Sequence, residues 1–135
     1  MKKILSIHYS SAAFNLAMLL LRLGVGILMM NHGYHKLVGF SETKEKFISF
    51  LGLGQSLSLS LCIFAEFFCS MFLILGLFTR LATIPLIINT CVILFIVWGG
   101  DYFGKGEVPV HYLVSYLVLL LVGPGRISVD GLIGK

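Results

Sequence analysis

Residues 62–69 read Cys-Ile-Phe-Ala-Glu-Phe-Phe-Cys and place a single carboxylate, that of Glu66, in the middle of an apolar run. The run extends from Ser56 to Phe78, which is long enough to cross a bilayer as a helix. A charged group at mid-membrane costs about 2.5–3.5 kcal/mol on insertion scales. The stretch therefore predicts a transmembrane helix whose carboxylate is protonated, paired with a cation or turned toward a polar cavity.

The composition of the whole chain is typical of a helical membrane protein. Of its 135 residues, 58% are hydrophobic and only 12% are charged, and the mean hydropathy is +0.99. Apolar runs of about 20 residues recur, without the alternation that marks the strands of a membrane barrel. We expect an all-α polytopic membrane protein, a single membrane domain over residues 1–135. Its four transmembrane helices would form a bundle, at residues 12–30, 56–78, 81–98 and 108–122.

The segments around these spans predict topology. Lys2 and Lys3 precede an apolar stretch that lacks a small-x-small cleavage site, so we expect an uncleaved first span with a cytoplasmic N-terminus. Four spans then place the C-terminus in the cytoplasm as well. Between spans one and two, Ser41 is a plausible N-cap for a short amphipathic helix on the membrane surface at residues 41–53. A simple linker is the alternative for that segment.

Charge and cysteine content exclude some classes of function. The ten basic residues give a net charge of +4 but are scattered near helix ends, so we expect no nucleic-acid partner. Cys62, Cys69 and Cys91 lie in apolar runs without a Cys-x-x-Cys motif, which argues against a disulfide framework. Cys62, Glu66 and Cys69 share one helical stripe. Because no histidine joins that stripe, we expect no metal there.

Arg22 is the other charge deep inside an apolar run, about ten residues into span one. Glu66 lies about as far into span two, so antiparallel spans would bring the two to similar depth. An ion pair is the cheapest way to hold both there, and we predict one. It would either fix helix register or line a proton or ligand site. Gly24 and Gly26 beside Arg22 would allow a neighbouring helix to approach closely.

Two further polar clusters are predicted at the ends of the bundle. The outer cluster could bind a metal, shuttle protons or hold a ligand, or consist of ordinary interfacial residues. Its candidate ligand-binding members are His32, His35, Lys36, Glu107 and His111, with Asp101 in the adjoining loop. Nearby aromatic residues indicate an interfacial belt and would also suit a quinone head group. At the inner end we expect a structural network of ion pairs among Arg80, Arg126 and Asp130.

Several motifs resemble the DoxX family over roughly Asn15 to Ile133. They are Leu21-Arg22-Leu23-Gly24, His32-Gly33-Tyr34-His35-Lys36-Leu37, Ala65-Glu66, Gly76-Leu77-Phe78-Thr79-Arg80-Leu81-Ala82 and Gly123-Pro124-Gly125-Arg126-Ile127-Ser128-Val129-Asp130. The resemblance implies a four-helix protein, mostly of bacterial inner membranes, with Arg22, Glu66 and Glu107 at the family's intramembrane charged positions. The family includes a small subunit of thiosulfate:quinone oxidoreductase. Wider relatives include membrane thiol enzymes, but their Cys-x-x-Cys is missing here.

These observations lead us to expect a quinone-linked accessory or anchor subunit of a redox system. Its head-group site would be built around Arg22, Glu66 and the outer histidines, with a soluble or membrane redox partner supplying electrons. We expect no covalently bound cofactor and no metal, and the sequence identifies no catalytic set. One alternative is a non-enzymatic membrane protein, monomeric or homo-oligomeric, that is structural or binds a lipid or a small apolar ligand. Another is a proton-coupled transporter in which Glu66 titrates.

Overall fold

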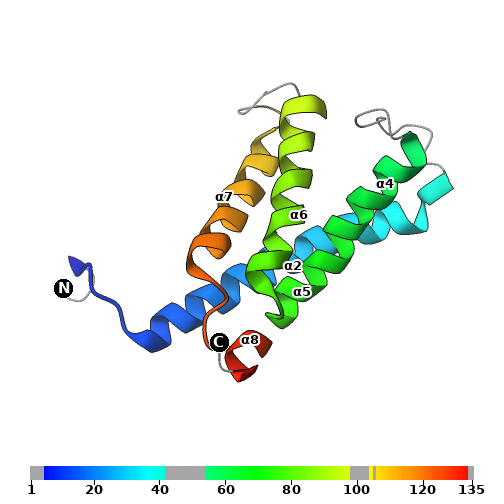
Figure 1. The fold of residues 1–135 in the computed structure, drawn as a ribbon. Coiled ribbons are helices and arrows are strands. Elements are labelled where there is room, and N and C mark those ends of the chain that lie inside the picture. Colours follow the sequence, from blue (N-terminus) through cyan, green and yellow to red (C-terminus); the bar gives the residue numbers. More distant parts are fainter. Residues whose placement is uncertain (1–4, 42–53, 98–103, 105, 134–135) are drawn as a thin grey trace.

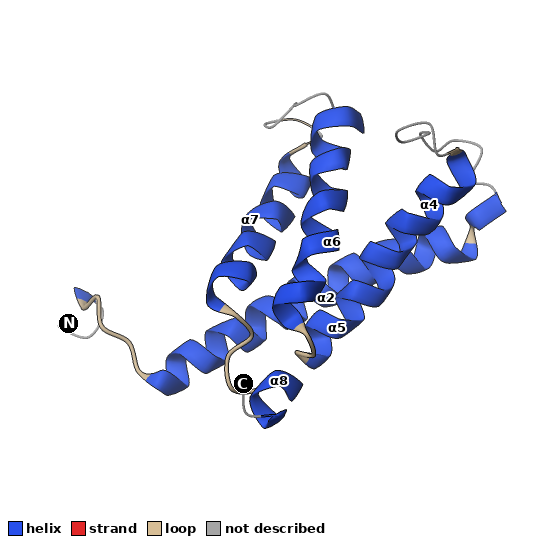
Figure 2. Cartoon of the chain, in the orientation of Figure 1, coloured by secondary structure: helices blue, strands red, loops and turns tan. Residues whose placement is uncertain are grey.

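The computed structural model describes residues 5–41, 54–97, 104 and 106–133, and all regular structure in these residues is helical (Figures 1 and 2). The elements in chain order are α2 (Ser11–Val38), α4 (Gln55–Ile63), η2 (Phe64–Cys69), α5 (Ser70–Leu75), α6 (Thr79–Val92), η3 (Ile93–Val97), α7 (Glu107–Val122) and α8 (Val129–Ile133). The two η elements are π-helical segments. The predicted all-α fold class is therefore confirmed.

Three continuous helices are long and apolar enough to cross a membrane, and α7 is a shorter apolar helix. The first is α2, the second joins α4, η2 and α5, and the third joins α6 and η3. The 28 residues of α2 measure about 42 Å, more than the ~30 Å hydrocarbon core, so α2 must tilt. Figure 1 shows it running obliquely to α6 and α7. The chain is a multi-pass membrane protein. The expected interfacial helix at residues 41–53 lies outside the described residues, apart from its first residue.

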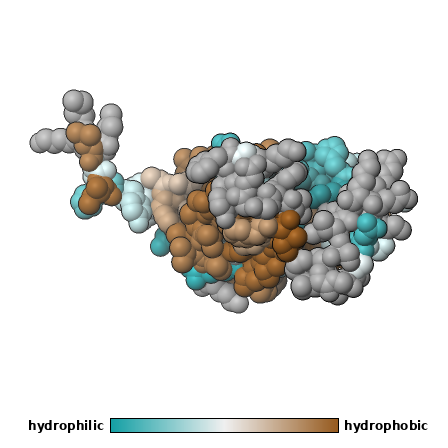
Figure 3. Space-filling view, turned by 90° about the horizontal axis from the view of Figure 1, so that it is seen from above, coloured by the Kyte–Doolittle hydropathy of each residue, from teal (hydrophilic) through white to brown (hydrophobic). Residues whose placement is uncertain are grey.

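The helices pack as two pairs, α6 against α7 and α2 against the second span. Their shared core contains Met18 and Met29 of α2, Leu73 of α5, Leu86 of α6 and Tyr116 of α7. Hydrophobic residues also cover much of the outer surface seen in Figure 3. Apolar side chains facing both inward and outward are what a bundle surrounded by lipid tails requires.

Glycines let α2 approach the second span closely. A Cβ atom at Gly33 would lie only 2.8 Å from the amide nitrogen of Phe67 and 2.9 Å from the carbonyl carbon of Glu66. A Cβ atom at Gly26 would lie 2.8 Å from a side-chain atom of α5, whereas one at Gly24 would have nothing within 4 Å. The predicted close approach is thus found at Gly26 and is wrong for Gly24. Gly33 provides a second close approach that the sequence analysis missed.

The turn between α5 and α6 is held by the segment that follows α7. Gly76 ends α5 in the left-handed conformation, and Phe78 also has a positive φ of 48°. The carboxylate of Asp130 accepts hydrogen bonds from the amides of Phe78 (2.9 Å) and Thr79 (3.0 Å). The Asp130 amide donates to the carbonyl of Gly76 at 2.9 Å. Asp130 therefore caps the start of α6, although it lies far away in the sequence. In most helices a residue directly before the helix has this role.

Arg22 joins α2 to the same region. Its side chain is buried, Nη1 donates to the carbonyl of Leu73 (3.4 Å), and Nη2 donates to the carbonyl of Ile127. A Cβ atom at Gly76 would overlap its guanidinium group, so glycine is needed there for space as well as for conformation. The buried guanidinium is held by backbone carbonyls at the point where α2, α5 and the closing segment meet.

The ion-pair network predicted among Arg80, Arg126 and Asp130 is wrong, because no salt bridge links these three described residues. The carboxylate of Asp130 is used for helix capping instead. Arg80 donates from Nη2 to the carbonyl of Val122 at 3.3 Å. Arg126 is exposed, and its backbone amide donates to Oδ1 of Asn15 at 2.9 Å. The segment after α7 is fastened by backbone contacts rather than by ion pairs.

We predict that Asp130→Ala lowers the stability of the purified protein by about 1–2 kcal/mol, the usual cost of losing a helix cap. Asp130→Asn retains one acceptor oxygen, so its stability should lie between that of Asp130→Ala and that of the wild type. Thermal unfolding in one detergent, followed by circular dichroism, measures the difference. An exposed control is Glu107→Gln, which should unfold like the wild type. If Asp130→Ala also unfolds like the wild type, the capping role is wrong.

We predict that Gly33→Ala destabilises the protein by roughly 1–3 kcal/mol, because the added methyl group meets backbone atoms that cannot rotate away. Gly24→Ala is the matched control on the same helix. It adds a methyl group in open space and should leave stability unchanged or slightly increased. The same unfolding measurement compares the two variants. Equal stability of the two alanine variants would contradict the close packing at Gly33.

Candidate functional site

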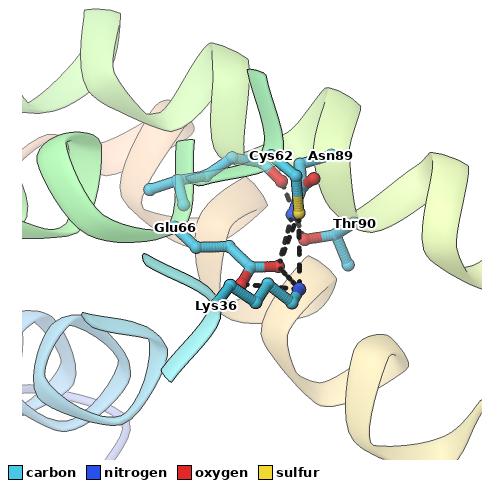
Figure 4. A network of polar contacts seen from close by, with 6 residues as sticks. Lys36, Cys62, Glu66, Asn89 and Thr90 are labelled. Carbon is cyan, nitrogen blue, oxygen red and sulfur yellow. Dashed lines mark hydrogen bonds and ion pairs between the residues drawn. The ribbon is translucent and has the colours of Figure 1, made fainter. Parts of the chain in front are cut away.

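Glu66 lies on the π-helical segment η2, and the residue is buried. Its partner is Lys36, whose Nζ lies 2.8 Å from each of the two carboxylate oxygens (Figure 4). The predicted pair between Glu66 and Arg22 is therefore wrong. Paired buried charges offset part of each other's desolvation cost. Glu66 therefore has the cationic partner that its burial requires, but that partner is Lys36.

The reason for the changed partner is the length and register of α2. This helix continues to Val38, so Lys36, which appeared to follow the first span, belongs to it. Gly33 contacts the backbone at Glu66, and Arg22 lies opposite Leu73. Leu73 is about 10 Å along the second span from Glu66, at 1.5 Å per residue. Arg22 is thus about two helical turns too far away in this register.

Two further side chains complete the polar network around Glu66. Asn89 of α6 donates from Nδ2 to Oε2 of Glu66 at 3.0 Å. The Cys62 thiol lies 3.2 Å from the same oxygen, and Lys36 Nζ lies 3.4 Å from the Cys62 sulfur. Thr90 lies beside the network in Figure 4, but its hydroxyl donates to the carbonyl of Leu86 within α6 at 2.7 Å. The network of Lys36, Cys62, Glu66 and Asn89 joins α2, the second span and α6.

The network is more open at its cationic side. The side chain of Lys36 is 25% exposed, whereas that of Glu66 is 2% exposed. The π-helical turn at Glu66 is also notable, because single π-helical turns within α-helices are often found at functional sites. A lysine with a partly exposed side chain, paired with a buried carboxylate, is a group from which a ligand can accept a hydrogen bond. This arrangement makes the network the candidate functional site.

Two aromatic residues of α7, Tyr112 and Tyr116, lie in the core that the helices share. Their rings are 6.1 Å apart and nearly parallel, at 26°. His32 of α2 packs edge-on against Tyr112, with ring centroids 6.2 Å apart. The hydroxyl of Tyr116 is fully buried and has no hydrogen-bond partner among the described residues. The core of the bundle therefore contains an aromatic pair with one unused hydrogen-bonding group.

The other predicted members of the outer cluster do not join this site. His35 packs against Tyr34 with ring centroids 6.0 Å apart. His111 and Glu107 form an exposed pair one helical turn apart, at 3.8 Å, which contributes little to stability. Asp101 lies outside the described residues. Within the described part of the chain, no three His, Cys, Asp or Glu side chains are placed to hold a metal ion.

Within the predicted ligand-binding set, Lys36 contacts Glu66 in the buried network, and Glu107 pairs with His111 on the exposed surface of α7. Cys62 and Asn89 were not among the predicted site residues. Cys62 could have been found from its position one helical turn before Glu66. Asn89 had a weaker signal, an amide in an otherwise apolar span. Its contact with Glu66 depends on how α6 packs against the second span.

Comparison with known proteins gives one match. The DoxX family model matches residues 17–99, a range that contains all four residues of the polar network. Neither the curated proteins nor the solved structures include a match to this chain. The family match covers more than half of the sequence and agrees with the helical membrane architecture, and the protein therefore belongs to the DoxX family.

Proposed function

We propose that this protein is a quinone-linked accessory or anchor subunit of a redox system, with the quinone head group bound beside Lys36 and Glu66. The observation that supports the proposal most is the partly exposed side chain of Lys36, whose ammonium group contacts the buried carboxylate of Glu66. A quinone presents two carbonyl acceptors, and its reduction to a quinol takes up two electrons and two protons. An ammonium–carboxylate pair inside the membrane suits both the binding and the proton supply.

Each residue of the network has a role in this proposal. Lys36 donates a hydrogen bond to one quinone carbonyl oxygen, and the carboxylate of Glu66 keeps the ammonium group charged and in place through their ion pair. Asn89 and Cys62 hold the carboxylate in place through their contacts with Oε2. The ring of Tyr112, which stacks near Tyr116 in the core, offers an aromatic surface. The electrons come from a soluble or membrane redox partner, which this subunit would anchor at the quinone.

A non-enzymatic role is the second candidate, and one observation favours it. Both oxygens of Glu66 already have partners inside the protein, namely Lys36, Cys62 and Asn89. A fully satisfied carboxylate can serve to tie three helices together without ever meeting a ligand. In that case the protein would be a structural or lipid-binding component, as a monomer or a homo-oligomer. The two candidates differ in whether Lys36 contributes to binding of a quinone.

We predict that Lys36→Gln combined with Glu66→Gln weakens quinone binding by about tenfold or more, through loss of a charge-assisted hydrogen bond. The double variant removes both charges together and so avoids leaving one buried charge without its partner. Binding of short-chain ubiquinone and menaquinone analogues is measured by the shift of thermal unfolding in lipid nanodiscs. The control is His111→Gln, an exposed substitution that should bind like the wild type.

Three outcomes separate the candidates. Quinone-dependent stabilisation of the wild type and of His111→Gln, but not of the double variant, supports the quinone site. No stabilisation of the wild type by either quinone refutes it. Quinone binding that is equal in the wild type and the double variant also refutes the site, because binding then occurs elsewhere. The unfolding temperature without quinone reports separately how far the network stabilises the fold.

We further propose that the protein lies in the bacterial inner membrane with both termini in the cytoplasm. Lys2 and Lys3 precede the first span, and Arg80 and Arg126 lie at the end of the bundle where α2 begins. Basic residues near span ends favour the cytoplasmic side. We predict that green fluorescent protein fused after Lys135 is fluorescent in cells and that alkaline phosphatase fused there is inactive. The reverse result for both fusions would invert the topology.

A further inference from the structure

A cavity of about 910 Å³ lies at the end of the bundle where α2 begins, far from Lys36 near the other end of that helix. It is formed where three parts of the chain meet: the start of α2, the start of α6 and the segment after α7. Phe14 and Asn15, Thr79 and Arg80, and Gly123 and Arg126 line it, two residues from each part. The proposed quinone site does not use it.

The cavity carries an excess of positive charge. Two arginines, Arg80 and Arg126, line it, and both side chains are exposed. The acid on the lining is Asp130, whose two oxygens already accept hydrogen bonds from the backbone at the start of α6. Within the described residues, the guanidinium of Arg126 makes no hydrogen bond or salt bridge. A second negatively charged group is thus favoured in this cavity.

A buried, unused hydrogen-bonding group also lines the cavity. The side chain of Thr79 is completely buried, and its hydroxyl has no hydrogen-bond partner among the described residues. A buried hydroxyl without a partner costs free energy, which a ligand that supplies the acceptor would recover. Thr79 is also the first residue of α6, where the carboxylate of Asp130 already occupies the helix start. The hydroxyl of Thr79 and the two arginines together favour one ligand that carries several acceptor oxygens.

The rim of the cavity is apolar. Phe78, Leu81 and Val122 line it and are among the exposed hydrophobic residues of the protein, with Leu81 66% exposed. These residues lie at the ends of membrane-spanning helices, where head groups and the first methylene groups of lipids are found. An acyl chain could lie against them while the attached head group enters the cavity. A free inorganic anion would leave this apolar rim unused.

We propose that the cavity binds the phosphate group of an anionic phospholipid in the leaflet at which α2 begins. Arg80 and Arg126 contact the phosphate oxygens, the hydroxyl of Thr79 donates to one of them, and the acyl chains lie against the apolar rim. Arginine is suited to this task because its planar group donates two parallel hydrogen bonds to phosphate. The bound lipid would bridge α2, α6 and the closing segment, and so would stabilise the same junction that Arg22 and Asp130 hold.

The test compares lipid binding by the wild type and two variants in neutral phosphatidylcholine nanodiscs. Phosphatidylglycerol is titrated in, and its binding is followed by native mass spectrometry and by thermal unfolding. We expect the wild type to bind phosphatidylglycerol at least tenfold more tightly than phosphatidylcholine. Arg80→Gln combined with Arg126→Gln should abolish that preference. The matched control is His111→Gln at the other end of the bundle, which should retain it.

A second variant protects the test against misfolding of the double arginine variant. Thr79→Val removes the unpartnered hydroxyl but keeps the shape and the backbone amide that Asp130 caps. It should be at least as stable as the wild type without anionic lipid, and should bind phosphatidylglycerol about tenfold more weakly. A merely structural role for Thr79 would instead lower stability and leave lipid binding unchanged. That result would overturn the proposal.

The source of the phosphate is tested by competition. Inorganic phosphate and glycerol phosphate, added at millimolar concentration, should not displace phosphatidylglycerol from the wild type. Displacement by either compound at that concentration would show that a free phosphate compound is the ligand and would overturn the assignment to a lipid. Equal binding of phosphatidylglycerol and phosphatidylcholine by the wild type would overturn the proposal altogether.

Discussion

A charge buried in a bilayer must be neutralised by contacts within the protein, and this constraint determines how the four apolar helices are joined. Two buried charges lie far apart along the packed helices. The carboxylate of Glu66 is neutralised by Lys36 and held by Asn89. The guanidinium of Arg22 is held by backbone carbonyls of Leu73 and Ile127. Apolar side chains can pack against each other or against lipid tails in several alignments of two helices, so they specify the alignment poorly. Each of these polar contacts, by contrast, is lost if one helix slides by a turn along its neighbour. The buried polar groups therefore specify how the helices are aligned, and the apolar side chains pack within that alignment.

The end of the bundle near Arg22 shows the same principle applied to the backbone. A helix that begins in or near the membrane exposes amide groups that lipid cannot satisfy. Asp130 accepts two of these amides at the start of α6, although it lies after the last span. Gly76 leaves room for Ser128 of the closing segment and for the guanidinium of Arg22. The closing segment is thus a structural part of the bundle.

The sequence was sufficient to predict the class of fold and the need of Glu66 for a partner, because both depend on hydrophobicity and on the cost of burying charge. It was insufficient to predict the partner. The depth argument assumed that the first span ends where the apolar residues end, near Met30, but α2 continues to Val38 and takes Lys36 into the bundle. Helix length inside a membrane is set by tilt and packing as well as by composition. The contact with Asn89 could not be predicted for a related reason, since it depends on the rotation of α6 about its axis.

The difference in exposure within the polar network bears most directly on function. A network whose only task is to join helices gains nothing from an accessible cation, because access to water weakens the ion pair. Here Glu66 is held by three side chains while Lys36 remains partly exposed. The arrangement keeps the carboxylate fixed while part of the lysine side chain remains accessible. In the proposed quinone site, the head group would approach from that accessible side, and the contacts that Asn89 and Cys62 make with Glu66 would stay in place. The structural role and the proposed binding role are therefore compatible in one site.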